Sequence, residues 1–169
     1  IITNIHELFH KFLEMKYFDQ YKDDAYRIIG AAMKVHSELN WGLLEQIYQE
    51  ALYLELKEQG IECVREKEIP CYYKHYKLDK KYKADLVAGD IIVELKSVKE
   101  LNSAHRAQLF NYLRLTKKPV GILVNFGAGS LQGERYAYIE EENHCVLLDK
   151  NMNLLFDEDI DCEYDIEDE

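Results

Sequence analysis

A chain of 169 residues with a hydrophobic fraction of 47% can bury one substantial core, and its four cysteines lack the C-x-x-C spacing of zinc and iron–sulfur sites. No apolar run approaches the roughly 20 residues of a membrane span, and the first residues lack the pattern of a signal peptide, so we expect a cytoplasmic protein with reduced thiols. The formal net charge of -11 argues against a nucleic-acid partner, but residues 157–169 hold nine acids and no Lys or Arg, which leaves -11 + 9 = -2 for residues 1–156.

Three helices are predicted in the first third of the chain. Apolar residues at helical spacing predict one over 5–18, within an N-terminal helical extension of residues 1–22. The next is predicted over 24–39, where Ile28, Ala31, Ala32, Val35 and Leu39 form one stripe. Residues 40–42 break it, and a third helix is expected from Leu43 to Gln59, ended by Gly60.

After residue 61 the pattern changes to that of strands. We expect strands over 63–73, 76–78, 82–87 and 91–96, with Pro70 at an edge or bend. A helix over 103–115 follows, with Ser103 as its N-cap, and then a buried strand over 120–126. Weaker strands are expected over 135–139, 145–148 and 154–156. This order indicates an α/β domain with a mixed sheet, and the acidic run 157–169 indicates a disordered tail.

The hairpin around Gly89-Asp90 is the most informative feature. With these two residues as the turn, Asp85 falls opposite Glu94, and Lys96 lies two residues further on the same face. Two carboxylates held roughly 5 Å apart repel, and a divalent cation between them would remove the conflict. Oxygen ligands suit Mg²⁺ or Mn²⁺, and a neighbouring lysine adds a fixed positive charge. The set suits cleavage of a phosphodiester, although solvated strand carboxylates neutralised by Lys96 would give the same pattern.

The segment Gly42-Leu43-Leu44-Glu45-Gln46-Ile47-Tyr48 resembles the signature of the GxxExxY family of small bacterial proteins, which belong to the PD-(D/E)XK nuclease superfamily. The resemblance extends in order over roughly residues 24–140, through Val35-His36, Ala84-Asp85-Leu86, Val93-Glu94-Leu95-Lys96, Ala107-Gln108, Tyr112-Leu113 and Asn125-Phe126. Ala84 stands where the superfamily name has Pro, and Asn40-Trp41-Gly42 replaces the usual Gly-Pro-Gly-like turn. The resemblance implies a restriction-endonuclease-like α-β-β-β-α-β core with a mixed central sheet flanked by helices, in a domain over 23–156. It also implies Mg²⁺-dependent hydrolysis of DNA.

The expected active site combines these residues. Asp85 and Glu94 are predicted metal ligands, with the Leu95 carbonyl a third, and Lys96 would orient or help deprotonate the attacking water, or stabilise charge on the phosphate. The resemblance makes Glu45 a further carboxylate facing the metal and Gln108 an active-site residue. Spacing alone fits a Glu45 at the third helical position beneath a Gly42 N-cap, and a Gln108 that only faces solvent. Tyr48, Tyr112 and His36 are expected to support the site.

A basic stretch interleaved with tyrosines predicts a nucleic-acid surface. We expect Lys74, Lys77, Lys81 and Lys83 to contact the phosphate backbone, extended by Arg106. The same lysines would also protect an exposed strand edge from aggregation. The sequence therefore favours a metal-dependent nuclease that acts on nucleic acid, most simply DNA, alone or with a protein partner or as a homodimer. The alternative is a catalytically idle, nuclease-like module that binds a protein or a nucleic acid.

Overall fold

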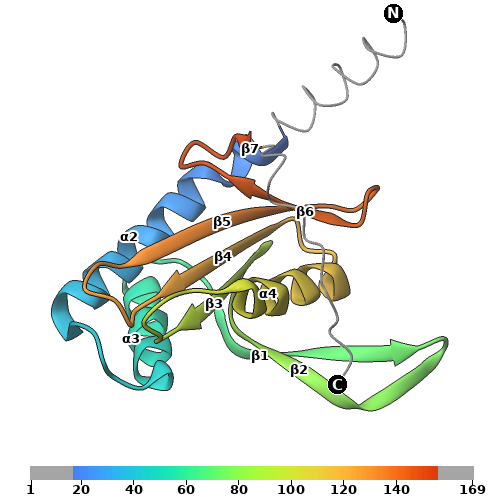
Figure 1. Cartoon of the computed structure of the whole chain (residues 1–169), viewed down its shortest axis with the longest axis horizontal. Coiled ribbons are helices and arrows are strands. Elements are labelled where there is room, and N and C mark those ends of the chain that lie inside the picture. The colour runs from blue at the N-terminus through green and yellow to red at the C-terminus, as the bar shows by residue number, and fades with distance from the viewer. Residues whose placement is uncertain (1–16, 156–169) are drawn as a thin grey trace, which may run out of the picture.

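The computed structural model describes residues 17–155 as a seven-stranded mixed sheet with helices on both faces (Figure 1). The elements in chain order are η1 (Phe18–Tyr21), α2 (Lys22–Leu39), α3 (Glu45–Glu58), β1 (Val64–Tyr73), β2 (Tyr76–Ala88), β3 (Ile91–Lys96), α4 (Ser103–Thr116), β4 (Val120–Asn125), β5 (Gln132–Ile139), β6 (His144–Leu148) and β7 (Leu154–Leu155). The run from α3 to β4 is the predicted α-β-β-β-α-β core, which confirms the restriction-endonuclease-like class. No helix within residues 17–155 has the length and apolarity needed to cross a membrane.

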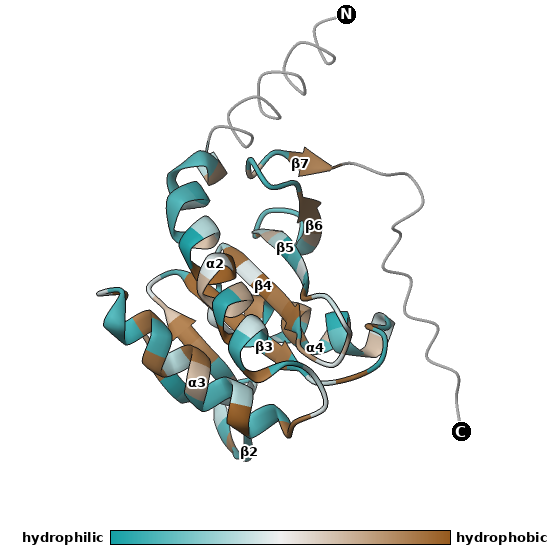
Figure 2. Cartoon of the chain, turned by 90° about the vertical axis from the view of Figure 1, so that its left-hand side faces the viewer, coloured by the Kyte–Doolittle hydropathy of each residue, from teal (hydrophilic) through white to brown (hydrophobic). Residues whose placement is uncertain are grey.

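The strands lie in the sheet in the same order as in the chain, from β1 to β7. Neighbours are antiparallel except β3 and β4, which run parallel and are connected through α4. Parallel strands need a long crossover, and a helix that packs on one face of the sheet provides it. Both strands are buried almost throughout, and Figure 2 shows the centre of the sheet as predominantly hydrophobic. A central strand covered on both faces reads as a nearly continuous apolar run, as 91–95 does.

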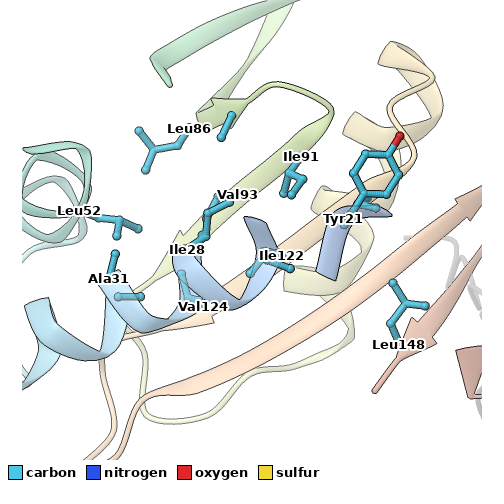
Figure 3. Close-up of a cluster of buried hydrophobic side chains, with 14 of the residues drawn as sticks. Tyr21, Ile28, Ala31, Leu52, Leu86, Ile91, Val93, Ile122, Val124 and Leu148 are labelled. Atoms are coloured by element: carbon cyan, nitrogen blue, oxygen red, sulfur yellow. The ribbon is translucent and has the colours of Figure 1, made fainter. Parts of the chain in front are cut away.

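Each face of the sheet has its own core. On one face, α2 and α3 pack against alternate residues of the central strands, and Figure 3 shows Ile28, Ala31 and Leu52 near Val93 and Ile122. On the other face, α4 packs with Leu109, Phe110, Tyr112 and Leu113 against Ile92, Leu123, Tyr136 and Tyr138. The stripe predicted for the 24–39 helix is confirmed by the burial of Ile28, Ala31, Ala32 and Val35. The apolar stripes of the helices therefore pack against the apolar side chains of the strands in two layers, one on each face of the sheet.

Three local predictions were wrong. The chain from 76 to 88 is one strand instead of two, because its polar middle is tolerated where β2 pairs with β1 away from the core. Helix α4 is capped by Asn102 instead of Ser103: the Asn102 side chain accepts from the His105 N–H, and the His105 ring accepts from the Asn102 N–H. Helix α3 begins at Glu45 with Leu44 as its N-cap, so Glu45 is not at the third helical position.

The remaining predictions concern the two ends of the chain, the position of Pro70 and the last strand. Most of the helix expected over 5–18 and the whole acidic run 157–169 lie outside the described residues. The predicted edge position of Pro70 is confirmed, because β1 is the first strand of the sheet and its register with β2 shifts between Pro70 and Tyr72. The strand predicted over 154–156 is present as β7.

Asn125, at the end of β4, holds the segment that follows β3. Its buried amide accepts hydrogen bonds from the N–H groups of Val98 and Gly127 (3.0 Å each) and donates to the Val98 carbonyl (2.9 Å). The Phe126 N–H donates to the Lys96 carbonyl over 2.8 Å. Val98 therefore lies so close to Gly127 that a Cβ at residue 127 would be 2.2 Å from the Val98 carbonyl oxygen.

We expect Gly127→Ala to lower the free energy of unfolding by about 2 kcal/mol or more, because either the 97–99 segment or the β4–β5 loop must move. Gly129→Ala in the same loop is the matched control, since a Cβ there meets nothing within 4 Å. Urea unfolding of both variants measures the difference. Equal stability of the two variants would show that the loop absorbs the methyl group.

Candidate active site

The predicted carboxylate pair lies where β2 and β3 separate. The two strands pair at three positions, Leu86–Val93, Val87–Ile92 and Ala88–Ile91, which confirms the register predicted from the Gly89-Asp90 turn. At the next position the side chains replace the backbone ladder. The Asp85 N–H donates to Glu94 Oε1 (3.0 Å), and the Leu95 N–H donates to Asp85 Oδ2 (2.8 Å). Each carboxylate is thus held by a backbone N–H of the opposite strand.

Glu94 is buried to a degree that is rare for an acid. It lies in the central strand β3, two residues after Ile92, which packs against α4, and the residue is 2% exposed. Burial raises the pKa of Glu94 well above its usual range, and the negative charge of Asp85 raises it further. Lys96 opposes this shift only weakly, as the smallest of the causes. The pair therefore creates the electrostatic conflict expected from the sequence.

Lys96 is held by helix α4, which packs on the face of the sheet that Ile92 and, at every second residue, Glu94 and Lys96 share. Its ammonium group donates to Gln108 Oε1 over 2.5 Å, and Gln108 Nε2 donates to the Tyr112 hydroxyl over 2.8 Å. Burial raises the pKa of Tyr112 to about 12, so its hydroxyl stays protonated at neutral pH. The structure thus brings Gln108 and Tyr112 into one chain of hydrogen bonds that ends at Lys96, and Gln108 does not simply face solvent.

Glu45 approaches the same place from α3. It is the first residue of that helix and is half-buried. Burial raises the pKa of Glu45, the positive charge of Lys96 lowers it, and Asp85 and a hydrogen bond with the Ser97 backbone act more weakly in opposite directions. These interactions place Glu45 near both Lys96 and Asp85. Within residues 17–155, however, no three Asp, Glu, His or Cys side chains converge closely enough to hold an ion, so Asp85 and Glu94 stand as a pair.

Gln49 is a site residue that the sequence analysis missed. It is buried one turn after Glu45, and its Nε2 donates to Asp85 Oδ1 over 2.9 Å. Its Oε1 accepts a long hydrogen bond of 3.4 Å from Arg65 of β1. The four-residue spacing from Glu45 was the available signal, because residues i and i+4 share a helix face. Asp85 is therefore fixed on both oxygens, by α3 and by the Leu95 N–H.

Tyr48 and His36 lie next to the site and make structural contacts. The fully buried Tyr48 ring stacks on Phe126 at 4.6 Å, while its hydroxyl donates to the Asn40 carbonyl (2.5 Å) and accepts from the Leu43 N–H (3.2 Å). His36 Nε2 bonds with the Ala128 carbonyl at 2.8 Å. Tyr48 thereby fixes the loop that leads into Glu45, which agrees with a supporting role.

The predicted basic residues separate into two groups. Lys74, Lys77, Lys81 and Lys83 are all exposed on the β1–β2 hairpin, and Lys81 pairs with Glu68 at 2.7 Å. Arg106 instead makes a two-point ion pair with Glu134, at 2.8 and 2.7 Å, on the α4 face. Because its charge is already compensated, Arg106 does not add to a free basic surface.

The donor set suits a hard divalent cation. Asp85 and Glu94 offer carboxylate oxygens, and the Leu95 carbonyl is the next oxygen along β3. Mg²⁺ keeps several waters and binds through one or two carboxylates, so a pair is enough. A cation at this place would also compensate the charge that burial makes costly on Glu94.

Comparison with known proteins identifies a family. A family model described as the PD-(D/E)XK nuclease superfamily matches residues 22–136, which is more than half of the chain. This range runs from the start of α2 into β5 and includes every predicted site residue. No curated protein and no solved structure matches the chain.

We expect Glu94→Gln to be more stable than the wild type at neutral pH. A raised pKa in the folded state means that Glu94 contributes stability below its unfolded pKa of about 4.3 and that this contribution is lost as the pH rises through the folded pKa. Gln cannot ionise and keeps an oxygen for the Asp85 N–H, so the gain should grow with pH and disappear in acid. Urea unfolding from pH 4 to 8, without divalent cations, measures it.

Glu141→Gln, in the exposed β5–β6 turn, is the control and should differ little from the wild type at any pH. A Glu94→Gln protein that is less stable than the wild type across the whole range would contradict the assigned cost of the buried charge.

Proposed function

The chain belongs to the PD-(D/E)XK nuclease superfamily, and from this premise we propose that it is a Mg²⁺- or Mn²⁺-dependent nuclease that hydrolyses phosphodiester bonds in DNA. The single observation that carries the proposal is the convergence at the fork between β2 and β3. There Asp85 and Glu94 exchange hydrogen bonds with the opposite strands, and Lys96 stands beside them with its partner Gln108. We also infer that the chain belongs to the GxxExxY group, because Gly42, Glu45 and Tyr48 carry that signature.

Asp85 and Glu94 are the residues that would hold the ion, with the Leu95 carbonyl as a further oxygen. When bound, a divalent cation polarises a phosphate oxygen and lowers the pKa of water. Gln49 keeps Asp85 in the orientation that this needs, through the 2.9 Å hydrogen bond to Oδ1. Glu45 lies close enough to Asp85 for the charge of Asp85 to raise the pKa of Glu45. Glu45 would complete the site through water.

Lys96 would act on the attacking water and on the phosphate. The Lys96 side chain lies next to two carboxylates, and its hydrogen bond to Gln108 fixes the position of the ammonium group. From there Lys96 can orient the water, help to deprotonate it, or stabilise the charge that develops on the phosphate. Gln108, which Tyr112 holds in turn, would fix Lys96 and contact the phosphate or the water.

We expect Lys96→Met to lower cleavage at least a hundredfold while the fold is preserved, because the variant keeps an unbranched side chain but loses the ammonium group, with its charge and its hydrogen bond to Gln108. The measurement is cleavage of linear, nicked, branched and single-stranded DNA, and of RNA, with Mg²⁺ or Mn²⁺. Lys99→Met, which follows the same strand but lies in the exposed loop, is the matched control and should keep full activity.

Glu94→Gln, run beside these variants, should be inactive although folded. Products from the wild type that do not depend on the metal, or full activity of Lys96→Met, would refute the assigned chemistry. Calorimetric binding of Mn²⁺ by the wild type without any product would instead favour the catalytically idle binding module.

A further inference from the structure

The outer part of the β1–β2 hairpin, residues 69–84, is a basic arm on an acidic protein. It projects beyond the end of α4, and no helix within residues 17–155 lies over its tip (Figure 1). The arm holds Lys74, Lys77, Lys80, Lys81 and Lys83 but only one acid, Asp79. Because Lys81 pairs with Glu68 just before the arm, the formal charge of residues 68–84 is 5 - 2 = +3, in a chain of -11. This concentration of positive charge is suited to a phosphate backbone.

Exposed aromatic rings alternate with these lysines. Tyr72, Tyr73 and Tyr76 are 59%, 62% and 60% exposed, and Tyr82, nearer the body, is 47% exposed. Tyr73 and Tyr76 are directly opposite each other across the two strands, and the His75 ring lies 4.0 Å from that of Tyr76. The rings are therefore available to a ligand at the tip of the arm.

Protection of an edge strand explains the lysines but not the tyrosines. Charged residues on an edge prevent pairing with other chains, whereas exposed aromatic and β-prone residues promote it. Four exposed tyrosines on one hairpin thus carry a cost for solubility. A ligand that stacks on the tyrosine rings and is attracted by the charge of the lysines explains the two features together.

The arm leads into the candidate active site. Lys81 and Lys83 precede Asp85 at every second residue of β2, and such residues share one face of a strand. The Tyr82 ring lies 5.5 Å from that of Tyr112, which is hydrogen-bonded to Gln108. At about 3.3 Å per residue, Tyr76 is about 30 Å from Asp85 along the strand, so a nucleic-acid strand of several nucleotides would follow the arm to the carboxylates.

We propose that this arm binds single-stranded DNA, so that the substrate carries an unpaired segment next to the bond that is cut; the inference rests on the nuclease function proposed above. Bases in a duplex are already stacked on each other and cannot cover the tyrosines, whereas every unpaired base offers a ring face. Lysines bind the phosphates of both forms. The tyrosines are thus the part of the arm that distinguishes single-stranded from double-stranded DNA.

The test is binding of the full chain, in EDTA, to labelled oligothymidylate and to a duplex of the same length, measured by fluorescence anisotropy. The wild type should bind the single strand more tightly. Tyr73→Ala/Tyr76→Ala should weaken single-strand binding by about tenfold or more for each stacked base and leave duplex binding unchanged. Lys74→Ala/Lys77→Ala should weaken both forms and reduce the salt dependence of both.

Tyr26→Ala is the matched control, because Tyr26 is 73% exposed on α2, outside the arm, and its loss should change neither affinity. Equal losses for single strand and duplex, or no loss in the tyrosine variant, would overturn the proposal. So would tighter binding of oligouridylate than of oligothymidylate, or a wild-type dimer in sedimentation that only the tyrosine variant loses, since the rings would then face RNA or a second copy.

The experiments distinguish a failure of the arm proposal from a failure of the nuclease proposal. Because affinity is measured without divalent cations, single-strand binding by a protein that cuts nothing would leave the arm assigned and refute the nuclease. Metal-dependent cleavage of a blunt duplex at full rate by Tyr73→Ala/Tyr76→Ala would leave the nuclease assigned and refute the role of the arm.

Discussion

The separation of β2 from β3 at Asp85 and Glu94 is the constraint on which the site depends. A strand that leaves its neighbour inside a protein exposes backbone N–H groups to a region without water, and an unpaired buried group is costly. Here the two carboxylates accept those N–H groups, Asp85 from Leu95 and Glu94 from Asp85. The same hydrogen bonds that complete the sheet thus hold two acids close together. The cost is the charge on Glu94, which the fold buries and which Lys96 compensates only weakly.

The fork also explains why both helical layers reach the site. Residues on the two faces of an unbroken sheet are separated by the sheet itself, but at the fork side chains from either face can meet. Helix α3 contributes Glu45 and Gln49 from one layer, and α4 contributes Gln108 and Tyr112 from the other. Gln49 binds Asp85 and Gln108 binds Lys96, so each helix holds one of the charged groups. Displacing either helix would move one charged group relative to the other.

The parts that followed from sequence are those governed by short-range rules. The Gly89-Asp90 turn sets the register, and register sets which side chains face each other, so Asp85, Glu94 and Lys96 could be placed from twelve residues alone. The apolar run of β3 and the stripe of α2 indicated burial on both faces. The bond between Lys96 and Gln108 joins β3 to α4, two elements brought together only by the tertiary fold, and only the family resemblance pointed to a role for Gln108. Gln49 was missed because its only signal is the four-residue spacing from Glu45, which does not distinguish a glutamine that binds Asp85 from one that faces solvent. The Asn102 cap was missed because its neighbour Ser103 is an equally good cap by type.

Charge links the site to its proposed substrate. A phosphate that approaches Asp85, Glu94 and Glu45 meets several acids with Lys96 beside them, in a chain whose formal charge is -11. Repulsion between like charges would keep DNA away from this place unless a cation reverses its sign. The exposed lysines of the β1–β2 hairpin do not have this difficulty, because they attract phosphate directly. Binding at the hairpin and chemistry at the fork would therefore depend on different ions: the first would weaken as salt rises, and the second would need the divalent cation that makes the buried carboxylates compatible with phosphate.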